Sequence, residues 1–274
     1  MQNTSIDTFN NLSIHLKKWL PESEIKGIII LIHGLGEHVE RYDHVGVYFN
    51  KHNFAVYGFD LPGHGRSGGT RGHINSFESV YGYINKILDN IKKDYPATPV
   101  FLYGHSLGGL IATNYLLKTE PAISGLIASS PGLTNKIKAS KFKLLMVKIL
   151  SGLLPTFLIK TNLEPELISR DEEVVNNYIN DPLVHDLAST RLAHESISSG
   201  QEIIKGKNKT SVPFLLIQGT NDFIVPVEAN VDFAKRLEGN VTIKLWEGLY
   251  HEVHNESEKE EVLAYVHSWM CRFL

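Results

Sequence analysis

A serine between two glycines is the feature that most restricts how this chain can fold. Residues 100–109 read VFLYGHSLGG, a short β-branched and aromatic run that leads into a helix-forming sequence. Glycines two residues either side of Ser106 permit a strand-to-helix turn so sharp that Cβ atoms there would collide with neighbouring backbone. A serine on such a turn is exposed where its strand ends. The pattern therefore predicts a nucleophile at the edge of a sheet.

Short apolar runs recur along the chain and predict buried strands. They cover residues 27–32, 54–59, 99–103, 123–128, 213–218 and 241–245. Segments with helical spacing lie among them, at 77–93, 107–117, 228–237 and 258–269. Buried strands that alternate with helices indicate an α/β fold with a mostly parallel sheet and helices on both faces. Residues 12–19 instead alternate apolar and polar side chains, which predicts a half-solvated antiparallel edge strand.

The alternation stops between Leu133 and Glu195. This stretch has no buried-strand pattern, and it holds an apolar, lysine-rich helical segment followed by the acidic turn 170–173. We expect one α/β domain, formed by residues 1–132 and 196–274, with an inserted helical cap at 133–195 that acts as a lid. The length of 274 residues is ordinary for a single domain of this kind.

A serine hydroxyl is a weak nucleophile at neutral pH, so its chemistry also requires a histidine base and a carboxylate that orients the base. In the α/β-hydrolase arrangement these follow the serine in the order Asp, His, each just past a strand end. Asp222 follows the predicted strand 213–218, and His251 follows the predicted strand 241–245. The sequence therefore predicts a catalytic triad of Ser106, Asp222 and His251.

Other residues compete for these roles. His254 lies close to His251 and is a second candidate for the base, while Asp222 has an alternative reading as a simple turn former. Asp60 also ends a predicted strand, but it precedes the serine in the chain, and we expect it to organise the loop that follows.

An acyl-transfer site needs two backbone N–H donors for the oxyanion. One comes from the residue after the nucleophile, which is Leu107, and the other from the loop after an earlier strand. Loop 32–38 reads IHGLGEH, and we expect Leu35 to supply the second donor because its flanking glycines let the backbone approach the substrate.

Two further motifs have weaker interpretations. Residues 63–68 read GHGRSG and match a dinucleotide-binding pattern, but no helix opens there and no acidic strand end follows at the expected distance. Residues 251–254 read HEVH, one residue short of the HExxH zinc motif. We expect neither a metal ion nor another cofactor.

Charge and composition limit the partners and the compartment. The formal net charge of −3 gives no global attraction to nucleic acid, and a single cysteine excludes an internal disulfide. The first residues lack the basic and apolar regions of a secretory signal, and no apolar run has the length of a membrane span. We expect a cytoplasmic protein with peripheral membrane association.

Several motifs together resemble one family. They are HGLGEH at 33–38 with Arg41 and Tyr42, DLPGHGRS at 60–67, RGHI at 71–74, GHSLGG at 104–109, NDPL at 180–183 and YHE at 250–252. In combination they resemble the monoacylglycerol lipase and lysophospholipase family of α/β-hydrolases, over nearly the whole chain. The resemblance implies the same triad and the same two oxyanion donors.

The resemblance also implies residues that hold the substrate head group. Arg41 and His105 fall on matching motifs, and Tyr178 lies at the expected distance before the NDPL motif. The acidic cap residue that contacts glycerol in the family has no clean match, because Val174 occupies the nearest position and Glu173 precedes it. We assign Glu173 to this role, and the departure leaves the head-group preference open.

These features predict a serine ester hydrolase that cleaves single-chain lipid esters, with monoacylglycerol as substrate and an acyl-enzyme on Ser106. The alternatives are a lysophospholipase, a general carboxylesterase, a perhydrolase, a peptidase and a hydrolase-fold binding protein without turnover.

The lysines around the apolar segment 144–159 are suited to an anionic bilayer surface. These lysines are Lys136, Lys138, Lys141, Lys143, Lys148 and Lys160. The alternative is a cap helix packed on the core with solvated lysines.

Overall fold

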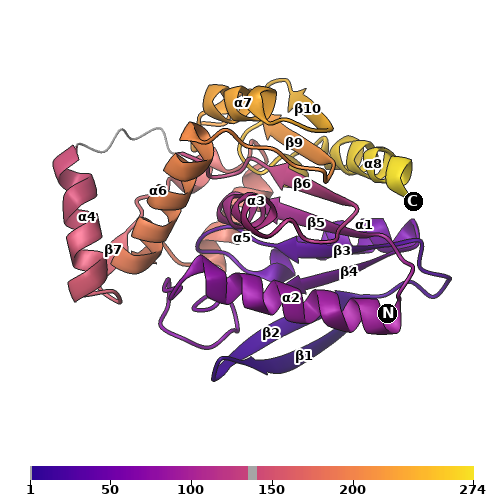
Figure 1. Cartoon of the computed structure of the whole chain (residues 1–274), viewed down its shortest axis with the longest axis horizontal. Coiled ribbons are helices and arrows are strands. Elements are labelled where there is room, and N and C mark those ends of the chain that lie inside the picture. The colour runs from indigo at the N-terminus through magenta and orange to yellow at the C-terminus, as the bar shows by residue number, and fades with distance from the viewer. Residues whose placement is uncertain (1, 135–140) are drawn as a thin grey trace.

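The computed structural model describes residues 2–134 and 141–274, and its centre is an eight-stranded sheet (Figure 1). The sheet has the strand order β1-β2-β4-β3-β5-β6-β9-β10. These strands are β1 (Gln2–Phe9), β2 (Leu12–Trp19), β3 (Gly27–Ile32), β4 (Phe54–Phe59), β5 (Val100–His105), β6 (Gly125–Ser129), β9 (Phe214–Gly219) and β10 (Val241–Trp246). All neighbouring pairs from β4 to β10 in this order are parallel. Strand β2 pairs antiparallel with both of its neighbours, β1 and β4. The predicted mostly parallel α/β sheet is confirmed.

The two edges of the sheet differ from the prediction. Strand β2 is not the edge, because β1 pairs with it along its whole length. The sequence of β1 is polar and its side chains are largely exposed, so it carries no apolar pattern. At the other edge, β10 is half-buried throughout rather than covered on both faces. An edge strand has a neighbour on one side only, which leaves its side chains partly in contact with solvent.

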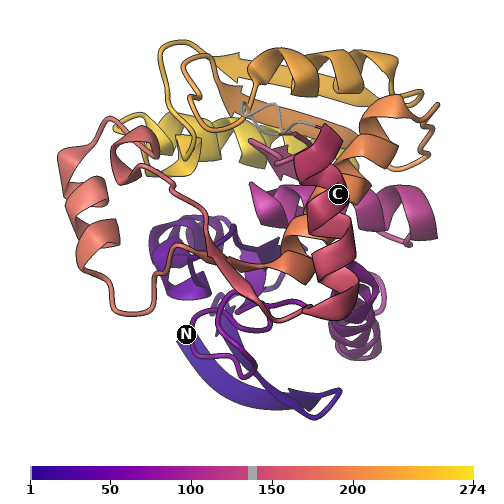
Figure 2. The same ribbon diagram turned by 90° about the vertical axis from the view of Figure 1, so that its left-hand side faces the viewer.

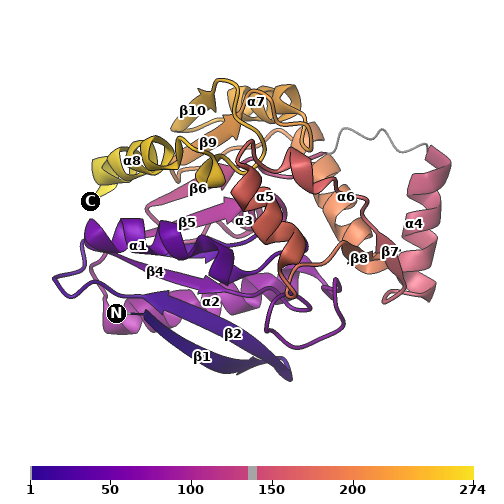
Figure 3. The same cartoon turned by 180° about the vertical axis from the view of Figure 1, so that it is seen from behind.

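Helices cover both faces of the sheet, as predicted. Side chains alternate along β3, so Ile28 and Ile30 join one buried cluster while Ile29 and Leu31 join the other. Helices α2 (Phe77–Asp94), α3 (Leu107–Thr119) and α7 (Val227–Arg236) pack in the first cluster (Figure 1). Helices α1 (Asp43–Lys51) and α8 (Lys259–Met270) pack in the second, on the face turned to the viewer in Figure 3. Helix α1 was not predicted.

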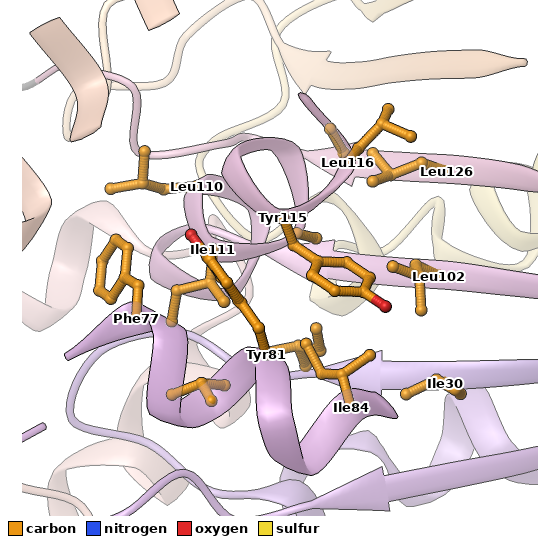
Figure 4. Close-up of a cluster of buried hydrophobic side chains, with 14 of the residues drawn as sticks. Ile30, Phe77, Tyr81, Ile84, Leu102, Leu110, Ile111, Tyr115, Leu116 and Leu126 are labelled. Atoms are coloured by element: carbon orange, nitrogen blue, oxygen red, sulfur yellow. The ribbon is translucent and has the colours of Figure 1, made fainter. Parts of the chain in front are cut away.

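The contact between α2 and α3 holds the helix that follows Ser106 on the sheet. Figure 4 shows Tyr81 and Ile84 of α2 facing Ile111 and Tyr115 of α3, with Leu102 of the sheet beside them. All five side chains are buried. Burying large side chains contributes about 1.5–3 kcal/mol each, so this contact helps to fix α3 on the sheet.

The chain between β6 and β9 forms a separate group of elements beyond the sheet, and this group faces the viewer in Figure 2. It consists of α4 (Lys141–Leu153), β7 (Leu158–Lys160), the 3₁₀ turn η2 (Pro165–Leu167), α5 (Glu172–Asn180), β8 (Leu187–Ser189) and α6 (Thr190–Lys205). Helix α4 lies against α6, and β7 pairs antiparallel with β8. The expected cap boundary at residue 195 falls inside α6, so one continuous helix crosses it.

Several contacts join this inserted group to loops at the ends of the sheet strands. Two are backbone hydrogen bonds to early loops, from His185 to Gly36 at 2.8 Å and from Ser189 to Gly72 at 2.8 Å. The side chains of His38 and Asp181 meet at 2.8 Å, and the N–H of Glu252 donates to Ile168 at 2.8 Å. The segment from 168 to 189 is therefore attached to the loops that carry the predicted site.

No helix in the described part of the chain is both long enough and apolar enough to cross a bilayer. Lys136 and Lys138 of the predicted basic cluster lie outside the described residues, as do the side chains of Lys141 and Lys143.

Candidate active site

Ser106 occupies the turn between β5 and α3. Its φ of 52° lies in the left-handed region, which costs a residue with a side chain of order 1–3 kcal/mol. Backbone hydrogen bonds hold it there, because its N–H donates to Ser129 at 3.0 Å and its carbonyl accepts from Gly132 at 2.9 Å. The predicted strand-turn-helix context is therefore present, and the strained serine is held at the end of β5.

The flanking glycines are required by close contacts between backbones. A Cβ on Gly108 would lie 2.1 Å from the carbonyl oxygen of Ile32, and one on Gly104 would lie 2.4 Å from that of Gly108. These distances are far below van der Waals contact, and a backbone atom cannot move aside as a side chain does. The turn is thus sharp because the helix starts almost against the neighbouring strand β3.

We expect Gly108→Ala to lose roughly 3 kcal/mol or more of unfolding free energy, since its Cβ would overlap backbone carbonyls. The matched control is Gly152→Ala in α4, where a Cβ meets nothing within 4 Å. That change should raise the free energy of unfolding by about 0.5–1 kcal/mol, because alanine has a higher helix propensity than glycine. Denaturant unfolding of both variants measures the difference, and equal midpoints would contradict the assignment of the tight turn.

Asp222 and His251 form a buried pair at the ends of β9 and β10. The Nδ1 atom of His251 lies 2.8 Å from Oδ2 of Asp222. Gln218 also donates to Oδ2 at 2.9 Å, while the N–H groups of Ile224 and Val225 donate to Oδ1 at 2.9 and 2.8 Å. With four donors around it, the carboxylate is fixed in orientation and in turn fixes the imidazole.

The charges of this pair stabilise each other. Burial by itself would raise the pKa of Asp222 and lower that of His251, because it disfavours both charged forms. The attraction between the two groups outweighs burial. The pKa of Asp222 is therefore lowered, and the pKa of His251 is raised above its ordinary 6.5. The pair is suited to hold a proton on His251 opposite a charged carboxylate.

His254, the other candidate for the base, pairs with no carboxylate among the described residues. Its ring stacks on Tyr42 at a centroid distance of 4.8 Å and lies 4.7 Å from the ring of His105. Within residues 2–134 and 141–274, neither of its ring nitrogens has a hydrogen-bond partner. Burial and nearby cationic groups hold its pKa well below the usual range. The geometry thus pairs Asp222 with His251, and His254 packs behind it.

Ser106 and His251 line the same cavity, of about 380 Å³, here called the His251 cavity. Leu35, from the loop after β3, also lines it. Leu107 is the first residue of α3, where N–H groups have no acceptor within the helix. The structure thus brings the loops after β3, β5, β9 and β10 together at one edge of the sheet, where ligands of such folds bind.

A second cavity, of about 560 Å³, shares Leu35, Ser106 and Ile224 with the first and is here called the α6 cavity. Its walls are largely aliphatic. They include Leu107, Leu110, Leu133, Leu144, Ile197, Ile204 and Val225. Ser106 therefore lies at the junction of two spaces, of which the second is suited to an acyl chain.

The residues predicted for the head group separate into two pairs. His105 and Tyr178 line the His251 cavity. Arg41 and Glu173 do not, and they line a different cavity of about 430 Å³, the Arg41 cavity. The role of Arg41 and Glu173 at the head group stays a prediction, and the structure places them apart from His105 and Tyr178. Glu173 stands in the first turn of α5, on the side of that helix facing the Arg41 cavity.

Arg41 is held away from the His251 cavity by two buried carboxylates. Its Nη2 lies 2.7 Å from Oε2 of Glu252, and its Nη1 lies 2.9 Å from Oε1 of Glu252 while also donating to Glu37. The guanidinium also covers the ring of Tyr178 at 4.7 Å. A planar fork bound in this way has little capacity left for a ligand.

Sequence reasoning missed Glu37 and Glu252, which do line the His251 cavity. Both are buried, and Glu37 also accepts from the hydroxyl of Tyr42 at 2.7 Å. The available signal was their position, because Glu37 lies in the predicted oxyanion loop and Glu252 directly follows His251. Asp60 has the role expected of it, since its carboxylate accepts from the N–H groups of Val39 and Arg66, both at 2.8 Å.

Comparison with known proteins gives consistent matches. The family model described as serine aminopeptidase, S33 (Hydrolase_4) matches residues 23–258. A monoacylglycerol lipase of Mycolicibacterium smegmatis is 33% identical over 93% of this chain and 92% of its own. An abhydrolase domain-containing protein of Dictyostelium discoideum is 38% identical over 96% of this chain, which spans only 28% of that longer protein. The crystal structure of Paleococcus ferrophilus monoacylglycerol lipase superposes with a TM-score of 0.87 at 33% identity, covering 95% of this chain and 99% of the other.

Proposed function

The chain belongs to the serine aminopeptidase S33 family of α/β-hydrolases, and on that premise we propose that it is a serine hydrolase that cleaves monoacylglycerol to glycerol and a fatty acid. The observation that carries the proposal is the position of Ser106. It lies between an aliphatic cavity and a cavity lined by the paired His251, so a lipid ester can place its chain on one side and its alcohol on the other. Similarity to lipid ester hydrolases supports the broader activity, which is hydrolysis of carboxylic esters.

The proposed reaction has two stages. The Oγ of Ser106 attacks the ester carbonyl while His251 takes its proton, and Asp222 stabilises the resulting imidazolium. The carbonyl oxygen becomes an oxyanion that accepts hydrogen bonds from the N–H groups of Leu35 and Leu107. Collapse of this intermediate breaks the ester bond, and His251 gives its proton to the departing glycerol. Water, deprotonated by His251, then cleaves the acyl-enzyme and releases the fatty acid.

The pH dependence of hydrolysis follows from the raised pKa of His251. Only neutral imidazole can accept the serine proton, so kcat/KM should fall as pH drops through that pKa. Because Asp222 raises it, we expect the midpoint of the acid limb to lie above 6.5. The measurement is glycerol release from monooctanoylglycerol across the titration range of histidine. No hydrolysis would overturn the proposed activity, and a pH-independent rate would contradict His251 as the base.

We also propose that residues 133–195 form a cap over the site. Thr161, Leu163, Glu164, Ile168 and Tyr178 from this segment line the His251 cavity above Ser106. The contacts from 168 to 189 hold one part of the cap against the core. Helix α4, which lies against α6, forms the outer part.

The outer part of the proposed cap has an apolar surface that we propose contacts a membrane. Leu145 and Leu153 are 52% and 75% exposed. Met146, Ile149, Leu154, Phe157 and Ile159 are exposed beside them. Among the predicted basic residues, Lys148 and Lys160 are also exposed. A cluster of this kind on one monomer is typical of a surface that meets lipid or protein. Leu144 of the same helix lines the α6 cavity, which connects this surface to the proposed chain-binding space.

Flotation with anionic liposomes tests the membrane contact. Leu145, Ile149 and Leu153 are spaced by four residues and share one face of α4. We expect the triple change Leu145→Gln, Ile149→Gln and Leu153→Gln to reduce the floated fraction about tenfold, because it removes apolar area without altering charge. Ile6→Gln, at an equally exposed position on β1, is the control and should float like the parent protein. Equal flotation of all three proteins would contradict the proposal.

A further inference from the structure

The His251 cavity has an acidic lining. Three glutamates line it, namely Glu37, Glu164 and Glu252, and none of the described residues around it is a lysine or arginine. Glu37 and Glu252 are buried in its wall, whereas Glu164 is exposed at η2. Any group that enters this cavity beside Ser106 therefore meets carboxylates and no free cationic side chain.

Arg41 does not reverse this charge. It is the cation nearest the two buried glutamates, and it pairs with both of them at once. One positive charge is thus shared between two carboxyl groups. The net charge of Arg41, Glu37 and Glu252 together is therefore zero when Glu37 is protonated and negative when it is not. Burial and the nearby Glu252 raise the pKa of Glu37, while the pKa of Glu252 is lowered to about 2, chiefly by Arg41 acting against burial. The Glu252 carboxylate stays charged at neutral pH.

The histidines in the wall add no lasting positive charge. Burial lowers the pKa of His105 to about 3, and burial together with Arg71 lowers that of His185 to about 4. Both rings are therefore neutral at neutral pH. His251 carries a proton in the reaction, but that charge is already paired with Asp222.

We propose that this acidic wall selects esters of uncharged alcohols and excludes esters whose head group carries an anionic phosphate. The inference rests on the proposed function and places the alcohol of the substrate in the His251 cavity, since the lining of the α6 cavity is largely aliphatic, with Lys205 among its few polar residues. A phosphate on the glycerol would lie within a few bonds of the reacting carbonyl and hence among the glutamates. Like charges in a partly buried site repel strongly, and the described residues that line the His251 cavity include no arginine or lysine to pair with the phosphate.

The test compares three octanoyl esters that differ only in head group. They are octanoylglycerol, octanoylglycerol phosphate and the corresponding phosphocholine ester, all below their micelle concentrations so that interfacial charge plays no part. We expect kcat/KM for the phosphate ester to be at least about tenfold below that for octanoylglycerol, on Coulomb grounds. The phosphocholine ester, whose phosphate is offset by a cation, should fall between them.

Variants then locate the discrimination. Glu164→Gln removes an exposed charge whose carboxylate has no hydrogen-bond partner among the described residues. It should reduce the ratio of kcat/KM for octanoylglycerol to kcat/KM for the phosphate ester about threefold at low salt. Its control is Glu166→Gln, an exposed glutamate of the same 3₁₀ turn that does not line the cavity, and this variant should keep the parent ratio. Glu252→Gln should reduce the same ratio about tenfold, because salt screens the buried charge of Glu252 less than the exposed charge of Glu164.

The outcomes separate this inference from the proposed function. Rates for the phosphate and neutral esters within about threefold of each other would overturn the selectivity and leave the esterase assignment standing. A parent-like ratio in correctly folded Glu164→Gln and Glu252→Gln would also overturn it, because the wall would then not be its source. Failure to hydrolyse any of the three esters would overturn both proposals.

Discussion

Replacing Ser106 by alanine should reduce kcat for monooctanoylglycerol by about 10⁶-fold while leaving the protein folded. The loss is large because the hydroxyl is the proposed nucleophile, and because Ser130, the other described serine with positive φ, donates its hydroxyl to the carbonyl of His251 at 2.7 Å. Alanine also carries a Cβ at a φ of 52°, so it keeps the backbone strain and should hardly alter stability. Initial rates and thermal unfolding of the same preparation check both statements.

The control for that variant is Ser198→Ala, an exposed serine on α6 whose hydroxyl bonds only to backbone carbonyls of its own helix. It should retain the parent rate. Labelling by a fluorophosphonate provides a second readout, since the reagent reacts with an activated serine whether or not the substrate is known. Labelling of the Ser106→Ala variant at the parent level would place the nucleophile elsewhere. A parent protein that is not labelled would support the binding-protein alternative.

Asp222→Asn should lower kcat by about 10⁴-fold, because it reverses the hydrogen bonding of His251. If the amide oxygen keeps the N–H donors of Ile224 and Val225, its NH₂ group faces the Nδ1 atom of His251 and the NH₂ group of Gln218. The imidazole then accepts at Nδ1 and carries its proton on Nε2, where it cannot receive one from the serine.

The same variant should shift the acid limb of the remaining activity to lower pH, because the carboxylate that raises the pKa of His251 is gone. Asp232→Asn, an exposed change on α7, is the control and should leave both rate and pH profile unaltered. If Asp222→Asn retains more than about a tenth of the parent kcat with a parent pH profile, Asp222 does not orient the base.

Local patterns predicted much of the fold. Strands β3 and β4 begin and end where the apolar runs do, and α2 and α3 follow the helical spacing closely, because these signals depend on neighbours within a few residues. Strand β1 was missed for the same reason. Its polar side chains carry no periodic signal, and it is a strand because it pairs with β2.

The site shows the same division between local and distant information. Sequence position alone placed Ser106, Asp222 and His251 just after the ends of predicted strands. The parallel sheet then brings those strand ends to one edge. The partner of a long side chain such as Arg41 cannot be predicted from sequence position in this way. Arg41 was predicted at the head group from its motif, whereas its pairing with Glu252, 211 positions later in the chain, was not predicted. No spacing rule relates two such positions.

The sequence by itself determined the sharp turn at Ser106, the positions of β3, β4, α2 and α3, and the candidate residues that follow the strand ends, because each depends on short-range sterics or on the position of a residue just past a strand. Only the tertiary structure decided which carboxylates line the cavity, which histidine Asp222 pairs with, and which way Arg41 and Glu173 face. Those outcomes depend on contacts among β3, β10 and the inserted segment, and such contacts exist only once the chain has folded.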